Sequence, residues 1–491
     1  MGAQGLETLI SALRADQEDN EIVSYVLDSL CNIITGGLED PFESPAATDS
    51  NSEDVGIQFT EIFAKKNENI ALLLDLLAEK DFKIRWPSLK LLMGLLRNKI
   101  KEIQDCVLAY PMGVSRLMDL LADSREIIRN DALLVLVLLT RTNSNIQKIV
   151  AFENAFDKVF DIITAEGYTE GGVVVEDCLL VLQNLLKNNT SNQNFFKEGS
   201  FIQKLLPFLD FIDAGPNDTG EWPSQKISNL LFFLQVVRSL VSPTNPIQVT
   251  NSAQKVMSSC GLVAKLCSLL MATGIPSDLL TETICTVAEV VRGDHRNQEH
   301  LAGLSAPTTP PKPVLVVLLM SMVNEKQSFD LRMAVLYAFE CFLYKNELGQ
   351  AQIIETLLPN SPTVDPNIVT SGQLLCGGLF NNDSLTNWLV CVALSHTLID
   401  NKTQKEQLLR VQLATDPNAM PVSLMTQVCS MLQQSLKFQK RAGILVLIGT
   451  WLSQCPLAVS HFLNIPTNIP YVSFTLFAFC VRTKCNNGFH S

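Results

Sequence analysis

The residues best suited to acid–base or metal chemistry gather at one place in the chain. Asp294, His295, Glu299 and His300 lie within a single heptapeptide. A histidine and a carboxylate four residues apart share one face of a helix, which is how two metal ligands can be presented together. The alternative is an ordinary solvated helix start, which we favour because the chain holds only 5 scattered histidines. We therefore expect no metal and no cofactor here.

Signatures of catalysis are otherwise missing from the sequence. It contains no Walker motif, no GxSxG, no HExxH and no glycine-rich dinucleotide loop after a strand. The 13 cysteines form no CxxC pair, and most stand singly inside apolar stretches, as do Cys178, Cys267, Cys285, Cys341 and Cys391. Such cysteines are expected to be reduced thiols that pack as small core residues in a cytosolic protein. We expect the protein not to be an enzyme.

A row of basic residues is the candidate binding feature. Arg97, Lys187, Arg238 and Arg292 occupy one position at the ends of successive apolar segments. One interpretation is that each cation offsets the negative end of a helix dipole. The other is that the four residues form a basic edge that binds an acidic partner, and they are the only site residues that the sequence suggests.

These residues are carried by a helical unit that recurs along the chain. The segments Asn69–Asn98, Gly113–Thr142 and Val174–Asn188 each carry an apolar helix. In the first two segments this apolar helix follows a shorter helix that ends in Leu-Leu, and a polar turn separates the two helices. The aligned Asp75 and Asp119 are 44 positions apart. A helical period in the forties is typical of armadillo and HEAT repeats. The sequence predicts an all-α, armadillo/HEAT-like, right-handed helical solenoid without any sheet, which is mostly a binding surface.

Composition narrows the kind of partner. The chain has 491 residues, of which 47% are apolar and 18% charged, and its net charge is −13. An acidic chain without a basic block is a poor ligand for nucleic acid or anionic lipid. No uncharged apolar run reaches the roughly 18 residues that a membrane span needs. We expect no nucleic acid and no transmembrane segment.

The repeat pattern also divides the chain. Residues 1–35 are a partial first helical repeat, and residues 57–470 are armadillo-like repeats. Between them, 36–56 is rich in acidic residues, Pro, Ser and Gly and is expected to be a flexible loop. Residues 471–491 are aromatic and β-branched, lack the helical period and are expected to form a divergent tail.

The pattern makes specific predictions about side chains. Leu136 and Leu182, inside the long helices, should be buried. Trp86 and Trp388 align near the starts of such helices and are expected to be core wedges between repeats. Asn and Ser residues at the restart of each unit, as in Ser144–Ala155, should cap the first helix.

Several longer strings resemble one family closely. They are PMGVSRLMDLLADSREIIRND (111–131), VVVEDCLLVLQNLLKNNTSNQNFFKEGS (173–200), LVSPTNP (240–246), GQLLCGGLF (372–380) and TQKEQLLRVQLA (403–414). They resemble the armadillo-like globular head of the general vesicular transport factor family, which are golgin-type vesicle tethers. The resemblance runs from about Gly5 to Pro470.

The resemblance implies a function in vesicle tethering for transport from the endoplasmic reticulum to the Golgi and within the Golgi. It implies binding to a Rab-class small GTPase, and to golgins, SNAREs and the conserved oligomeric Golgi complex. The implied location is cytoplasmic and peripheral on Golgi and ER–Golgi transport membranes. The alternative is a generic cytosolic armadillo scaffold or cargo adaptor.

The chain departs from that family's plan in three ways. From the resemblance we expect the chain to start inside the first repeats, to diverge after about Pro470, and to carry no heptad segment or acidic tail. Family members dimerise in parallel through a long coiled coil, which needs sustained heptads. The expectation is therefore that the homodimer is lost or weakened in this chain, leaving a monomer prone to self-association.

Overall fold

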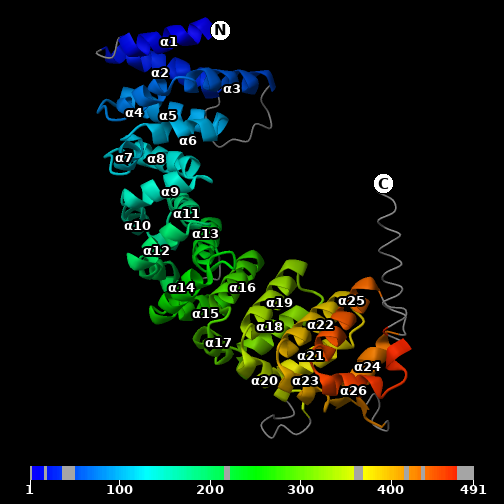
Figure 1. The fold of residues 1–491 in the computed structure, drawn as a ribbon. Helices are drawn as coiled ribbons and strands as arrows, with labels where there is room; N and C mark the ends of the chain where they lie inside the picture. The colour runs from blue at the N-terminus through cyan, green and yellow to red at the C-terminus, as the bar shows by residue number, and fades with distance from the viewer. Residues whose placement is uncertain are drawn as a thin grey trace, which may run out of the picture. The chain divides into compact units, whose positions relative to one another are not determined.

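The computed structural model describes residues 3–15, 19–35, 50–214, 222–358, 369–413, 420–432, 437–470 and 472. Almost all regular structure in these residues is α-helix (Figure 1). The chain divides into two compact units. Unit 1 comprises Met1–Asp210 and Trp222–Ala253, and unit 2 comprises Phe211–Glu221 and Gln254–Ser491.

The elements up to residue 259 are α1 (Ala3–Ala15), α2 (Asn20–Thr35), α3 (Ser50–Ala64), α4 (Asn67–Leu76), α5 (Phe82–Asn98), α6 (Ile100–Ala109), α7 (Gly113–Leu120), α8 (Glu126–Leu139), α9 (Ser144–Phe152), α10 (Ala155–Glu166), η1 (Tyr168–Glu170), α11 (Val173–Leu186), α12 (Thr190–Glu198), η2 (Gln203–Ala214), α13 (Ser224–Val241) and α14 (Ile247–Ser259). They are followed by α15 (Leu262–Leu270), α16 (Ser277–Val291), α17 (His295–Ala302), β1 (Ser305–Ala306), β2 (Lys312–Pro313), α18 (Val314–Val323), α19 (Phe329–Leu343), α20 (Glu347–Glu355), α21 (Ser371–Leu379), α22 (Ser384–Leu398), α23 (Lys402–Leu408), β3 (Gln412–Leu413), β4 (Val422–Ser423), α24 (Leu424–Met431), α25 (Phe438–Leu452) and α26 (Pro456–Leu463).

Most helices form consecutive triplets in which the third helix is the longest, as in α6–α7–α8 and α20–α21–α22. In unit 1 the third helices α2, α5, α8, α11 and α13 pack one on the next (Figure 1). In unit 2 the third helices α16, α19, α22 and α25 do the same. A third helix such as α8 or α22 is therefore covered by the neighbouring third helices and by the first two helices of its own triplet. The all-α, armadillo-like class predicted from the repeat is confirmed.

The apolar stripes of the third helices form the core. Leu136 in α8 and Leu182 in α11 are both 0% exposed, as predicted. Complete burial of a leucine side chain stabilises the fold by about 1.5–3 kcal/mol relative to exposure. Neighbouring third helices also share polar contacts, since the Asn184 side chain donates to the Val137 carbonyl at 2.9 Å. These contacts place the C-terminal turns of α8 and α11 side by side.

A left-handed residue ends most of the described turns from a third helix into the next triplet, although the turn from α5 to α6 has none. Thr142, Asn188, Lys345, Asp400 and Gln454 have φ between 53° and 57° at this position. The residue that follows is a helix cap in several triplets: Asn143, Asn189, Asn346 and Asn401 each accept a hydrogen bond from a backbone N–H of the helix that follows. The caps thus precede the Asn and Ser residues that the sequence pattern suggested, because the capping residue lies just before the helix and its oxygen accepts from the N–H of the second or third helical residue.

A buried glutamine on the first helix of most triplets binds the C-terminal end of the third helix. Gln104 donates to the Leu139 and Arg141 carbonyls, both at 2.8 Å. Gln350 donates in the same way to His396 and Ile399, both at 3.0 Å. Further examples are Gln193 to Leu186 and Ser239, Gln254 to Glu289 and Arg292, and Gln298 to Cys341 and Tyr344. These side chains satisfy carbonyls that a helix leaves unpaired at its C-terminal end.

The expectation of a fold without any sheet needs a correction. Strand β1 pairs antiparallel with β2, and β3 pairs antiparallel with β4. Each pair is two residues long per strand and lies between the first and second helices of a triplet, before α18 and α24. These connections are long enough for their backbone groups to pair with each other. No sheet of three strands occurs in the part of the chain that the structure describes.

The acidic segment predicted as a loop at 36–56 also needs a correction. Helix α3 begins at Ser50, so the last part of that segment is helical, and 36–49 lies outside the described residues. Of the predicted tail 471–491, only residue 472 is described.

Candidate partner-binding surfaces

The acidic and histidine cluster is a helix start. Asp294 is the N-cap of α17 and accepts a hydrogen bond from the Asn297 backbone N–H at 3.0 Å. His295, Glu299 and His300 are exposed on the same short helix. The described residues contain no group of three or more His, Cys, Asp or Glu side chains placed to hold a metal ion. The cluster is thus a capped, solvated helix end.

Four of the five cysteines singled out in the sequence lie in the core. Cys178, Cys267, Cys341 and Cys391 are at most 3% exposed. Burial raises the pKa of the Cys267 and Cys391 thiols to about 12, which keeps them protonated at neutral pH. Cys285 is half-buried. The interpretation as small core side chains therefore holds for the four buried cysteines.

Three of the four candidate basic residues lie in unit 1, at the C-terminal ends of the third helices α5, α11 and α13. Arg97 lies in the last turn of α5 and Lys187 directly follows α11, and both are exposed. Arg238 is half-buried in the last turn of α13. The side chain of Gln183 donates to that of Gln235 at 2.8 Å, which places the ends of α11 and α13 together. We call Arg97, Lys187 and Arg238 the basic edge of unit 1.

Arg292 has a different setting. It directly follows α16 in unit 2, and its Nε lies 3.2 Å from Glu289 Oε2. Its carbonyl accepts a hydrogen bond from Gln254 at 3.0 Å. The structure therefore gives Arg292 an acidic partner within its own chain, and the dipole interpretation applies to it better than the binding interpretation.

An aromatic groove that the sequence did not predict lies between α2 and α5 in unit 1. It has a volume of about 310 Å³. It is lined by Glu21, Ser24, Tyr25, Asp28, Phe82, Lys83, Trp86 and Pro87. We call it the α2–α5 groove. Trp86 is half-buried here, as is Trp388 in α22, so the expectation that both are core wedges is wrong.

The α2–α5 groove follows a helical stripe. Phe82, Trp86 and Lys90 are spaced by four residues along α5, so their side chains share one face. The Trp86 indole Nε1 donates to Asp131 Oδ2 at 2.7 Å, which fixes the ring against α8. Burial raises the pKa of Asp131, while this hydrogen bond and the charge of Lys90 oppose the rise. The i, i+4, i+8 spacing was the signal in the sequence that could have revealed the stripe.

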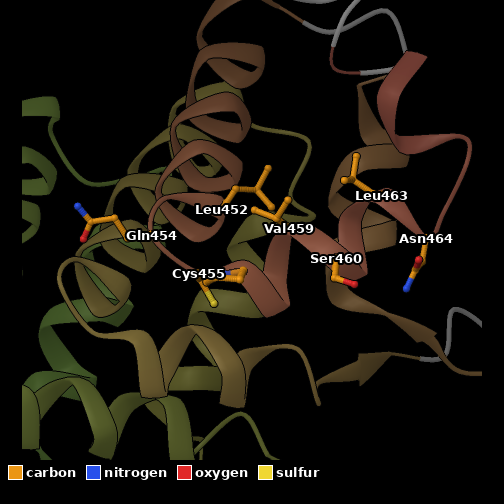
Figure 2. Close-up of a pocket in the computed structure, with 8 residues that line it drawn as sticks. Leu452, Gln454, Cys455, Val459, Ser460, Leu463 and Asn464 are labelled. Atoms are coloured by element: carbon orange, nitrogen blue, oxygen red, sulfur yellow. The ribbon is translucent and has the colours of Figure 1, made fainter.

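A second groove lies at the end of unit 2, where α25 passes into α26. Figure 2 shows Leu452, Cys455, Val459 and Leu463 around it, together with polar side chains of Gln454, Ser460 and Asn464. Its volume is about 520 Å³. Leu463 is 53% exposed, whereas Cys455 is buried. Most of the side chains that line this groove on α25 and α26 are thus apolar.

The two units define the class of the protein: a helical-repeat protein of the armadillo type, whose described surface carries edges and grooves. No helix among the described residues is long and apolar enough to cross a membrane.

The sequence of the repeats is that of a particular family. Residues 294–477 match the family described as Uso1/p115-like vesicle tethering protein, head region. Residues 219–279 match the armadillo tether-repeat of vesicular transport factor. The chain is 57% identical to the human general vesicular transport factor p115 over 96% of its own length and 48% of that protein's. It is 31% identical to golgin candidate 6 of Arabidopsis thaliana, over 94% of this chain and 53% of that protein.

The chain therefore belongs to the Uso1/p115-like family of vesicle-tethering proteins and spans about half the length of the curated relatives it matches. A solved structure of Uso1 has the same fold, with a TM-score of 0.78 at 22% identity. The alignment covers 96% of this chain and 76% of the other.

Proposed function

We propose that this chain acts as the head region of a vesicle tether in ER-to-Golgi and intra-Golgi transport, and that it works by binding proteins rather than by catalysis. The observation that carries the proposal is the 57% identity to general vesicular transport factors, which extends over 96% of the chain. The similarity to these factors covers the whole stack of repeats, whereas a function that depended on one pocket would require similarity only around that pocket.

The first partner that we propose is a Rab-class small GTPase, at the cytoplasmic face of Golgi and ER–Golgi transport membranes. Golgins, SNAREs and the conserved oligomeric Golgi complex are further proposed partners, all by family resemblance. The basic edge of unit 1 supports a contact with an acidic protein surface, because Arg97 and Lys187 are exposed and have no ion-pair partner among the described residues. Arg292 is part of the original candidate row but is the weakest member.

The proposal is tested by capture on immobilised Rab GTPases locked in the GTP or GDP state. We expect GTP-selective capture of the wild-type chain and at least about tenfold weaker capture of the double variant Arg97→Glu/Lys187→Glu, since reversing two contact charges adds repulsion. The matched control is Lys101→Glu/Lys148→Glu, which reverses two exposed charges on the first helices α6 and α9.

Two outcomes would count against the proposal. Capture that is indifferent to the nucleotide on every Rab would favour a generic armadillo scaffold. Equal loss in both double variants would show that the basic edge has no special role.

A further inference from the structure

The α2–α5 groove presents aromatic rings to solvent. The Phe82 and Trp86 rings stack with their centroids 5.3 Å apart and an interplanar angle of 13°. Tyr25, on the opposite wall, is 70% exposed. Tryptophan and tyrosine are enriched among the residues that contribute most of the binding energy at protein interfaces.

The stripe along α5 already attracts cations from its own unit. The Lys90 ammonium lies 4.6 Å from the Trp86 ring centroid, and the Arg125 guanidinium lies 5.7 Å from the Phe82 ring. The negative face of an aromatic ring attracts such cations within about 6 Å. The Tyr25 ring has no such cation among the described residues, so its face is available.

Two carboxylates flank that ring. Glu21 and Asp28 lie seven residues apart on α2, which places them two turns apart on the helix face that carries Tyr25. Neither side chain has an ion-pair or hydrogen-bond partner among the described residues. Lys83 lines the opposite wall of the groove but makes no ion pair with either of them. The groove thus offers two unpaired carboxylates, of Glu21 and Asp28, and the open face of Tyr25. The only ammonium among its lining residues is that of Lys83.

We propose that the α2–α5 groove binds a lysine or arginine side chain from a basic segment of a protein partner, with the cation against Tyr25 and between Glu21 and Asp28. A choline lipid headgroup fits less well, because its phosphate would approach the same two carboxylates and be repelled. The groove has the opposite charge preference from the basic edge, so this inference does not depend on the proposed GTPase contact.

The test uses a fluorescein-labelled heptapeptide in which glycine alternates with arginine and lysine, and fluorescence anisotropy on the full chain. We expect Glu21→Gln/Asp28→Asn to weaken binding about tenfold, as the loss of two partly exposed ion pairs predicts. The control Glu102→Gln/Asp105→Asn makes the same change of charge on the exposed face of α6 and should stay within about twofold. The chain is acidic overall and therefore also attracts a basic peptide outside the groove. The comparison of the two variants therefore separates binding at the groove from this non-specific attraction.

A third variant tests the aromatic wall. Tyr25→Ser removes a largely exposed ring, so it should leave the melting temperature unchanged while weakening peptide binding about threefold. Equal affinities for the groove and control variants would overturn the proposal. So would flotation with phosphatidylcholine vesicles that Glu21→Gln/Asp28→Asn abolishes while peptide binding stays intact, since the groove would then be a lipid site.

Discussion

The side-chain amide of Asn401 donates a hydrogen bond to the Oε1 atom of Gln350 at 2.8 Å. Asn401 caps α23, and Gln350, which lies 51 positions earlier in α20, holds the last carbonyls of α22. One asparagine and one glutamine thereby join the first helices of two neighbouring triplets to the end of the long helix between them. The contact links adjacent repeats through partly buried polar groups. Apolar packing alone would define the position of one repeat on the next less specifically.

The Asn401–Gln350 contact predicts energetic coupling between repeats. In a double-mutant cycle with Asn401→Ser, which keeps a capping oxygen, and Gln350→Met, we expect a coupling free energy of about 1 kcal/mol. Denaturant unfolding of the four proteins measures it. A value near zero would mean that the two side chains act independently.

The preceding triplet supplies the matched control. Asn346 donates to the Phe342 carbonyl, and the Oε1 atom of Gln298 has no hydrogen-bond partner in the structure. The same cycle with Asn346→Ser and Gln298→Met should therefore show coupling well below about 0.5 kcal/mol.

Leu136 and Leu182 predict large costs of truncation. Each is 0% exposed inside a third helix, so replacement by Ala leaves a cavity and should lower the free energy of unfolding by about 2–5 kcal/mol. Leu348→Ala, at a leucine that is 69% exposed, should cost less than about 0.5 kcal/mol. Thermal melts of the three variants distinguish the two classes, and a small effect at Leu136 would contradict the packing.

Asp177 predicts a dependence of stability on pH. Burial, aided by the charge of Glu176, raises the pKa of Asp177 to about 7. The folded state then holds more protons than the unfolded state between about pH 4 and 7, so this carboxyl makes the fold less stable as pH rises through that window. Asp177→Asn should therefore stabilise the protein at pH 8 by about 1 kcal/mol, a value reduced for partial exposure, and change little at pH 4. Asp105→Asn, at an exposed site, should show no such pH-dependent gain.

Asp383 predicts the opposite dependence. Burial would raise the pKa of this carboxyl, but hydrogen bonds from the Thr386 hydroxyl and backbone N–H and from Arg332, 3.1 Å away, lower it to about 2. Its stabilising effect is therefore present above about pH 4 and lost as pH falls toward 2. Asp383→Asn should lower the free energy of unfolding by about 2 kcal/mol at pH 7 and by much less at pH 2.5. A penalty that is the same at both pH values would mean that the side chain acts only by its shape.

The fold class was readable from the sequence because helical periodicity is local. The recurrence of Leu-rich helices with a period in the forties requires only that each helix bury one stripe, and Leu136 and Leu182 follow that stripe into the core. The family resemblance was also readable from the sequence, because similar strings of residues can be recognised without knowing which contacts they make.

The candidate site was only partly readable. The sequence found Arg97 and Lys187, because cations at helix ends form a visible pattern. It did not distinguish them from Arg292. The acidic neighbour Glu289 lies only three positions earlier in the chain, whereas the glutamine partner Gln254 comes from another helix, α14. It also missed Tyr25, which becomes part of a groove only when α2 lies against α5.

The sequence by itself thus determined the helices, their apolar faces and the family. Only the tertiary structure decided which polar residues join one repeat to the next and which stay exposed on the surface. Gln350, for example, looks like a surface glutamine in the sequence, but it is 5% exposed and bonded to carbonyls more than 40 residues away. The physical reason is that burial of an apolar stripe depends on local spacing, whereas the satisfaction of a polar group depends on atoms that only folding brings near.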